Sequence, residues 1–272
     1  MSIVRTIRKT ASRAALGYFC RRACADLERK ESEAAKRLSR ALKRFLDGEW
    51  EAADTERFRA IEGMRTRLAA SEKTVQVQDF GAVSGSLDLD VETMQHGRFE
   101  TRRISSICTT SAKSEFWCRC LYSLVREFRP KVGVELGTSL GISASYQASA
   151  MALNGGGELN TFEGSPALAD EAKGTFGALS LKNINVVVGP FNETLGPSIE
   201  KLPPIDYAFI DGHHHGESTI AYFDTIRARA SQQACFVFDD IRWSDGMKDA
   251  WYKIARTQEV AGATDLRSTP VV

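Results

Sequence analysis

The chain has 272 residues, of which 43% are hydrophobic and 26% are charged. These fractions are ordinary for a globular protein, and the length allows one core domain with an appendage. No apolar run is long enough to span a bilayer, so the composition argues against membrane-spanning helices. The net charge of +1 hides an asymmetry, because residues 1–45 carry a net charge of +9 and the remainder carries −8.

Residues 1–73 are predicted to form a basic, amphipathic helical extension. Apolar residues from Ile3 to Phe19 recur at near-helical spacing with basic residues between them. Such a helix can make a peripheral contact with an anionic membrane, and the alternatives are packing on the core or on a second subunit of a homodimer. A targeting peptide is a further interpretation, although a secretory signal's continuous apolar core is absent. Nucleic acid is not expected as a partner, because no base-reading pattern accompanies the charge.

Residues 74–110 are predicted to be a linker, and residues 111–272 the core domain. Gly81, Gly85 and Gly97 indicate loops, with a short strand near Val75–Val77. A helix is then predicted from Ser114, as its cap, to Phe128, and Pro130 follows as a stop signal.

The segment Val132–Ser143 is the most informative part of the core domain. An apolar run ends in Glu135, Gly137 and Gly141 follow, and a helical pattern begins, which predicts a buried strand, a tight turn and a helix N-terminus. Glycine turns let a ligand approach the backbone, and helix N-termini offer free N–H groups. The spacing matches neither the dinucleotide pattern nor a P-loop. The alternative is an ordinary strand–turn–helix corner without a ligand.

Four further strands are predicted at Gly157–Glu163, Ile184–Gly189, Pro204–Asp211 and Ala234–Asp240, with helices between them. Alternating strands and helices indicate an α/β fold with a parallel sheet. Ligands bind at the carboxyl ends of such strands, and most of these strands end in acids. Glu163 suits hydrogen bonding to both hydroxyls of a ribose, and the alternative is a solvated carboxylate.

Four segments carry a resemblance to a known family. The pattern E-L-G-x-x-x-G-x-S from Glu135 to Ser143 resembles the first motif of class I S-adenosylmethionine (SAM) methyltransferases, especially the catechol- and caffeoyl-type O-methyltransferases. The I-D-G-x-H motif within 209–224 and the F-D-D-I-x-W motif within 236–251 resemble a bacterial family of that class, as does D-F-G-A at 79–82. The resemblance covers roughly residues 75–260 and implies a Rossmann-like, doubly wound, mostly parallel sheet. It also implies a SAM site formed by Glu135, Gly137, Thr138, Ser139, Gly141, Glu163, Gly164 and Gly189.

The same resemblance implies an O-methyltransferase acting on a small-molecule or sugar-like acceptor. In catechol-type enzymes a divalent cation is held by acids whose positions correspond here to Asp211, Asp239 and Asp240. Asp240 replaces an amide, and this set still suits Mg²⁺ or another divalent cation. The alternative is that Asp240 makes structural hydrogen bonds to the loop at Trp243.

His214 takes the position of the family's lysine base and, with Asp211, is the predicted catalytic residue. Histidine titrates near neutral pH, which suits a general base. Alternatives are His213 as base or metal ligand, a zinc or iron site formed by Asp211 and the histidines, or a solvated turn at His213–His215.

Two other functions stay open at this stage. One is a non-catalytic SAM-binding module that docks to a membrane or partner, and the other is a hydroxylase-like relative that holds iron. Six cysteines without a C-x-x-C pair indicate reduced thiols and a cytoplasmic protein, with the basic helix as its membrane contact. At the C-terminus a helix is predicted over Ser244–Arg256 and a sixth strand within Ala263–Val272, which leaves little chain for a seventh.

Overall fold

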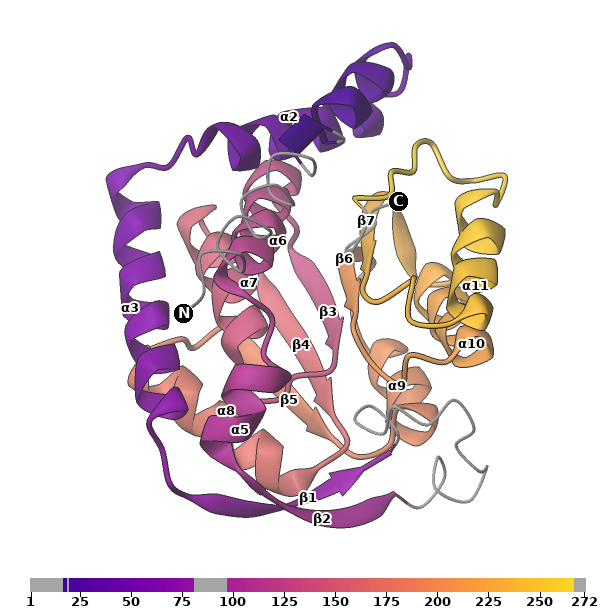
Figure 1. Ribbon diagram of the computed structural model, residues 1–272. Coiled ribbons are helices and arrows are strands. Elements are labelled where there is room, and N and C mark those ends of the chain that lie inside the picture. The colour runs from indigo at the N-terminus through magenta and orange to yellow at the C-terminus, as the bar shows by residue number, and fades with distance from the viewer. Residues whose placement is uncertain (1–16, 19, 81–96, 267–272) are drawn as a thin grey trace, which may run out of the picture.

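The computed structural model describes residues 17–18, 20–80 and 97–266 (Figure 1). The strands are β1 Thr74–Asp79, β2 Arg98–Arg103, β3 Val132–Leu136, β4 Glu158–Glu163, β5 Ile184–Val188, β6 Ile205–Ile210 and β7 Ala230–Phe238. The helices are α2 Glu33–Asp47, α3 Ala52–Ala69, α5 Ile104–Thr110, α6 Glu115–Phe128, α7 Ile142–Leu153, α8 Pro166–Ala178, α9 Phe191–Ile199, α10 Gly216–Arg227 and α11 Asp245–Ala255.

A five-stranded parallel sheet forms the centre of the molecule, with strand order β5-β4-β3-β6-β7 (Figure 1). The apolar runs predicted all five strands, although β7 begins at Ala230 and not at Ala234. Every residue of β3 is buried, because helices cover both faces of the sheet at its centre. From β3 the chain adds β4 and β5 on one side and β6 and β7 on the other, so the strand order switches between β3 and β6. The carboxyl ends of these two neighbouring strands lie at one edge of the sheet.

Two hydrophobic cores lie on opposite faces of this sheet. One contains apolar side chains of α2, α3, α6, α7 and α8, and the other contains those of α9, α10 and α11. Figure 1 shows α6 and α7 on one side of the strands and α10 and α11 on the other. The six cysteines are free and buried. The predicted doubly wound, Rossmann-like arrangement is therefore confirmed.

The N-terminal helices share the first core with the sheet. Leu42 of α2 and Ile61 of α3 are buried there, and Phe58 packs edge-on against Tyr122 of α6 with ring centroids 4.7 Å apart. The carboxylate of Asp54, fully buried in α3, accepts hydrogen bonds from the Tyr122 hydroxyl at 2.5 Å and from an α2 arginine at 2.7 Å. A domain boundary at residue 73 stays a prediction, and residues 1–16 lie outside the described part.

The predicted linker contains ordered elements. Strands β1 and β2 form an antiparallel pair, and α5 follows directly. The backbone N–H of Gln78 in β1 donates to the Ser165 hydroxyl at 3.2 Å, so this hairpin is fixed beside the N-terminus of α8. Gly81 and Ala82 of the D-F-G-A stretch lie outside the described residues. The serine at position 114 precedes α6 as predicted, but its side chain makes no capping hydrogen bond.

The C-terminal part agrees with the sequence only as far as α11. Within the expected sixth strand, the structure describes residues up to Leu266 and places a single bridge residue there, Thr264. Residues 267–272 lie outside the described part, so a sixth or seventh strand stays untested. Among described residues, no helix is long and apolar enough to cross a membrane.

Candidate functional site

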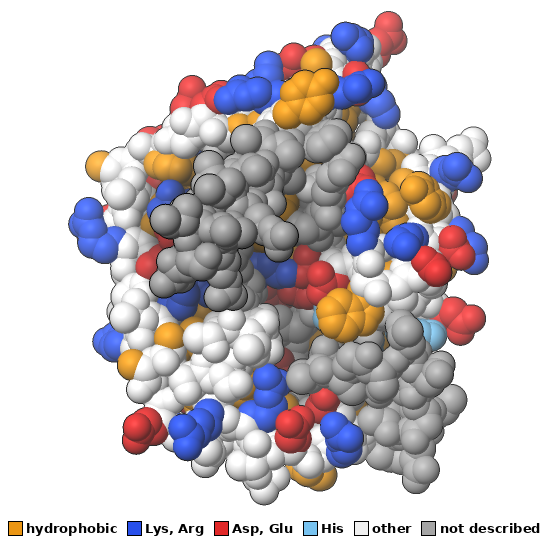
Figure 2. Space-filling view, in the orientation of Figure 1, with side chains coloured by type: hydrophobic (Ala, Val, Ile, Leu, Met, Phe, Trp, Pro, Cys, Tyr) orange, Lys and Arg blue, Asp and Glu red, His pale blue; other side chains and the backbone are white. Residues whose placement is uncertain are grey.

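A cavity of about 380 Å³ opens at the carboxyl edge of the sheet. Its walls come from the ends of β1, β4, β6 and β7, from the loop between β3 and α7, and from the segment between α5 and α6. Figure 2 shows acidic and basic side chains close together in a hollow near the centre of this face. Its volume lies in the range of small-molecule sites.

The glycine loop forms one wall. Gly137 has φ +100°, and a Cβ there would lie 2.1 Å from the backbone oxygen of Asp211, so only glycine fits. Gly141 also has positive φ, and its N–H donates to the Thr138 carbonyl at 2.8 Å, which closes the turn before α7. Residues 137–140 and 142–143 line the cavity, whereas Gly141 lies behind them. The predicted strand–turn–helix corner is therefore a cavity wall.

Glu135 lies beneath this loop and does not line the cavity. Its carboxylate accepts hydrogen bonds from Ser143 Oγ at 2.7 Å, Gln147 Nε2 at 2.6 Å and Thr161 Oγ1 at 2.6 Å. Burial raises the pKa of Glu135 to about 7, against the opposing effect of these donors. The sequence predicted a direct ligand contact, but the structure gives Glu135 protein partners that join the loop, α7 and β4.

Glu163 ends β4 and lines the cavity. One carboxylate oxygen accepts the backbone N–H of Ser139 at 2.8 Å, and the other accepts that of Ser165 at 2.9 Å. Burial raises the pKa of Glu163, and these donors lower it. Because a carboxylate offers about four acceptor sites, it retains capacity for ligand hydroxyls.

The two remaining glycines of the predicted cofactor site have different positions. Gly164 lines the cavity and faces Phe80, since a Cβ there would lie 2.6 Å from the Phe80 ring. Gly189 does not line the cavity, and its N–H donates to the Glu163 carbonyl at 2.9 Å. Gly189 thus supports the position of Glu163 from behind.

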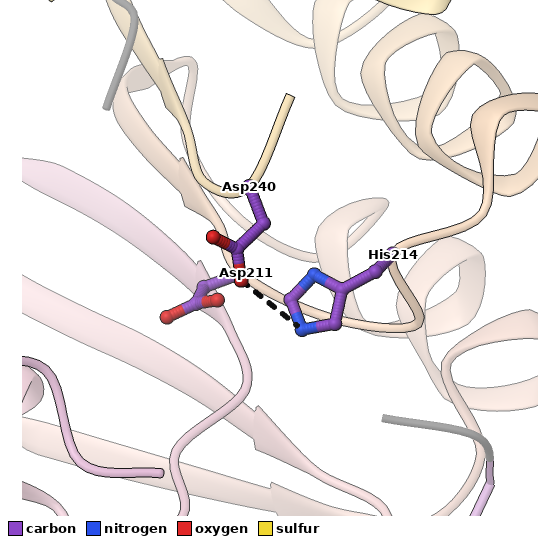
Figure 3. A group of neighbouring side chains, drawn as sticks. All are labelled: Asp211, His214 and Asp240. Atoms are coloured by element: carbon purple, nitrogen blue, oxygen red, sulfur yellow. Dashed lines mark ion pairs between the residues drawn. The ribbon is translucent and has the colours of Figure 1, made fainter. Parts of the chain in front are cut away.

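The acids after β6 and β7 meet at the opposite wall. Figure 3 shows Asp211, Asp240 and His214 converging from the ends of adjacent strands and from the loop before α10. One ligand atom from each lies within 4.8 Å of the others, and His214 Nε2 is 3.8 Å from Asp240 Oδ2. Asp239, predicted as a third metal ligand, lines the same cavity but is not part of this group, and it is only 3% exposed.

Lys113 is the site residue that sequence reasoning missed. It lies between α5 and α6, lines the cavity, contacts Asp239 Oδ2 through its Nζ, and places that Nζ 3.6 Å from Asp211 Oδ2. No motif includes this position, and its approach to the acids depends on the path of the chain after α5. The positive charge of Lys113 itself was the only feature of the sequence that could have indicated a role beside the acids.

The three adjacent histidines make three different sets of contacts. His213 Nδ1 is 2.6 Å from the Tyr222 hydroxyl, and burial, followed by its histidine neighbours, lowers the pKa of His213 to about 4. His215 caps α10 by accepting the Ser218 N–H. His214 alone faces the acids. His213, His214 and Asp240 all have φ between +47° and +61°, a conformation that is costly for residues other than glycine and is found at functional sites.

Comparison with known proteins identifies the domain type. Residues 134–241, from β3 to the loop after β7, match a family model described as a methyltransferase domain. No curated protein matches the chain. An O-methyltransferase from Bacillus cereus, solved in complex with SAH, is 22% identical, with 60% of this chain and 83% of that chain covered and a TM-score of 0.53. The O-methyltransferase TomG from Streptomyces achromogenes, involved in tomaymycin synthesis and solved with SAM, is 20% identical, with 59% and 81% covered and a TM-score of 0.52.

The structural likeness shows the fold, and the family model shows the domain type. Residues 134–241 therefore match a methyltransferase domain, and the fold is that of the solved O-methyltransferases, in agreement with the fold that the motifs predicted. The roles of individual site residues stay predictions.

Proposed function

We propose that this protein transfers the methyl group of SAM to an oxygen atom of a small-molecule acceptor. One observation carries the proposal: the glycine loop, Glu163 and the Asp211–His214–Asp240 group line the same cavity. The first two features suit a nucleoside-containing cofactor, and the third suits an acceptor that must lose a proton. A sugar-like or phenolic hydroxyl meets that requirement.

The cofactor half of the cavity fits SAM. The turn at Gly137 brings bare backbone to the cavity wall, and Glu163 offers acceptor sites for two ribose hydroxyls. Gly164 and Phe80 close the side next to β1. SAM, when bound, supplies a methyl group on a sulfonium that an incoming oxygen can attack. Glu135 and Gly189 act from behind the wall by keeping the loop and Glu163 in place.

The acceptor half provides a base. His214 lines the cavity, and its Nε2 can take the proton of an acceptor hydroxyl, with the carboxylate of Asp240 3.8 Å away. The Trp243 indole is half-exposed with its ring 5.7 Å from that of His214, so it offers an apolar surface beside the base. Fixing the acceptor oxygen in line with the methyl is a large part of the required catalysis.

A divalent cation held by Asp211, Asp239 and Asp240, as the resemblance implies, does not fit these side chains. The Lys113 ammonium contacts Asp239 and lies 3.6 Å from Asp211, whereas carboxylate oxygens approach Mg²⁺ or Ca²⁺ to about 2.0–2.6 Å. A cation there would face a positive charge within its own ligand set.

The peripheral membrane contact, the homodimer and the cytoplasmic location stay proposals based on the sequence. The basic segment that motivates the first lies mostly within residues 1–16, outside the described part. Chemical crosslinking and vesicle binding of the full chain would test them.

The decisive experiment is calorimetric binding of SAM and SAH to the wild type and to Glu163→Ala. We expect the variant to bind at least about tenfold more weakly, since a hydrogen bond to a charged group contributes about 1.5–3 kcal/mol. Glu158→Ala is the matched control, because Glu158 is exposed at the opposite end of the same strand. Unchanged binding in Glu163→Ala would refute the assigned cofactor site. Absence of binding to the wild type would overturn the proposed function itself.

A methyl-transfer assay with labelled SAM and a panel of phenols and sugars would identify the acceptor class. We expect transfer to an oxygen, with a rate that falls at least about a hundredfold in His214→Ala, the usual scale of general-base catalysis. Transfer to nitrogen or carbon acceptors alone would contradict the oxygen assignment.

A further inference from the structure

Lys113 has a position that a surface lysine does not take. Its side chain is 14% exposed, and its Nζ lies between Asp239, which it contacts, and Asp211 at 3.6 Å. Its backbone is also held, because the Cys118 thiol donates to the Lys113 carbonyl at 3.4 Å. Contacts of the side-chain Nζ and of the backbone carbonyl therefore both hold Lys113 at the cavity wall.

The acids at this edge require a positive charge. Asp239 is 3% exposed, and a buried carboxylate is costly unless it is paired and hydrogen-bonded. Asp211 shares the Lys113 ammonium with Asp239, and Asp240 follows Asp239 in the chain, so both add like charge. In the related catechol-type enzymes a divalent ion provides the compensation, whereas here the described structure provides a lysine.

Building on the proposed function, we propose that Lys113 is a built-in cation that replaces the divalent ion, so that this protein needs no metal between Asp211 and Asp239. An ammonium has three N–H donors, and two carboxylates pair with it among the described residues. Within the described part of the chain, at least one donor is thus left for an acceptor oxygen in the cavity that Lys113 lines. Lys113 is a positioning residue for the carboxylates and a contact for the acceptor.

The carboxylate directions support this assignment. Asp239 and Asp240 are adjacent in the chain, yet Asp239 turns to Lys113 and Asp240 turns to His214. The left-handed conformation of Asp240, with φ +49°, accompanies this separation. The three acids therefore do not converge on one point, and the only three-residue grouping of metal-ligating type in the described part is Asp211 with His214 and Asp240.

The test is a Mn²⁺ titration followed by electron paramagnetic resonance, with SAH present. The proteins are the wild type, Lys113→Met, Lys113→Arg and the matched control Lys248→Met, which removes an exposed lysine paired with Asp245 on α11. We expect the wild type, Lys113→Arg and Lys248→Met to bind Mn²⁺ with a Kd no lower than about 1 mM, which corresponds to a binding free energy of about 4 kcal/mol. Lys113→Met should bind Mn²⁺ at least about tenfold more tightly, because Asp211 and Asp239 would then face the ion without an ammonium.

Two results would overturn the proposal. One is stoichiometric binding of Mn²⁺ to the wild type, if the substitution Asp239→Asn abolishes that binding. This result does not depend on whether any Lys113 variant folds. The other is a folded Lys113→Met protein with the same weak Mn²⁺ affinity as the wild type. Retained SAH binding in calorimetry shows that each variant is folded with its cofactor site intact. Failure of the methyltransferase proposal would be seen as absent SAH binding in the wild type.

Discussion

Glu135 offers a quantitative test of how the glycine loop is supported. Its carboxylate is fully buried, and burial raises its pKa from the ordinary 4.5 to about 7. A group whose pKa is higher in the folded state binds its proton more tightly there, so it adds stability at low pH. That contribution is complete below pH 4.5 and is lost as the pH rises through 7.

The size of the effect follows from these two pKa values. Between pH 5 and pH 8 the free energy of unfolding should fall by about 2–3 kcal/mol on account of Glu135 alone. Glu135→Gln keeps the shape and removes the titration. The difference in stability between variant and wild type should therefore shift in favour of the variant by about this amount from pH 5 to pH 8.

Urea denaturation at half-unit steps of pH, without ligands, measures this difference. His213 titrates in the opposite sense, since its pKa is lowered to about 4 and its contribution is lost as the pH falls below 6.5. Because both proteins retain His213, that effect cancels in the difference. Glu158→Gln makes the same chemical change at an exposed position on β4 and is the matched control. A difference that stays constant from pH 5 to pH 8 would refute the assignment of a proton to buried Glu135.

Two further predictions concern the loop and the N-terminal helices. Gly137→Ala places a methyl group 2.1 Å from the Asp211 carbonyl oxygen, at a backbone φ of +100°. Calorimetry should therefore show at least about tenfold weaker SAM binding by this variant. The control Gly174→Ala, which has open space around the new methyl group, should bind SAM as the wild type does. Equal affinities for both variants would show that the turn tolerates a side chain. Asp54→Ala removes the buried carboxylate that a tyrosine and two arginines share, and urea denaturation should show a loss of about 3–5 kcal/mol. The exposed control Glu56→Ala should change stability by less than about 0.5 kcal/mol, and a similarly small loss in Asp54→Ala would contradict the role of this cluster.

The sequence was sufficient to locate the sheet and its functional edge. Five apolar runs, most of them ending in an acid, predicted five parallel strands, because β-strands of this kind are buried on both faces and helices must fill the intervals. The rule that all carboxyl ends of a parallel sheet lie at one edge then predicted that Glu163, Asp211 and Asp240 would lie near one cavity. That inference needs only the succession and the direction of the strands, which the alternation of apolar runs and helical segments predicts.

The direction of each side chain needed the tertiary structure. Glu135 comes one residue before the end of β3, and alternation along a strand turns it toward α7 instead of the cavity. Asp239 and Asp240 are neighbours with the same chemistry, yet their backbone conformations direct them to different partners. A motif states which residues are present at a strand end, but it does not state their dihedral angles.

What the sequence by itself determined is the parallel α/β fold, the glycine turn and the row of acids, since each follows from short-range periodicity and from the geometry of parallel strands. Only the tertiary structure placed Lys113 against Asp211 and Asp239 and gave each of the three adjacent histidines its own contacts. Lys113 belongs to a segment without a motif, and its position depends on how α5 and α6 pack on the sheet. Such long-range packing is set by the whole core, so no local pattern encodes it.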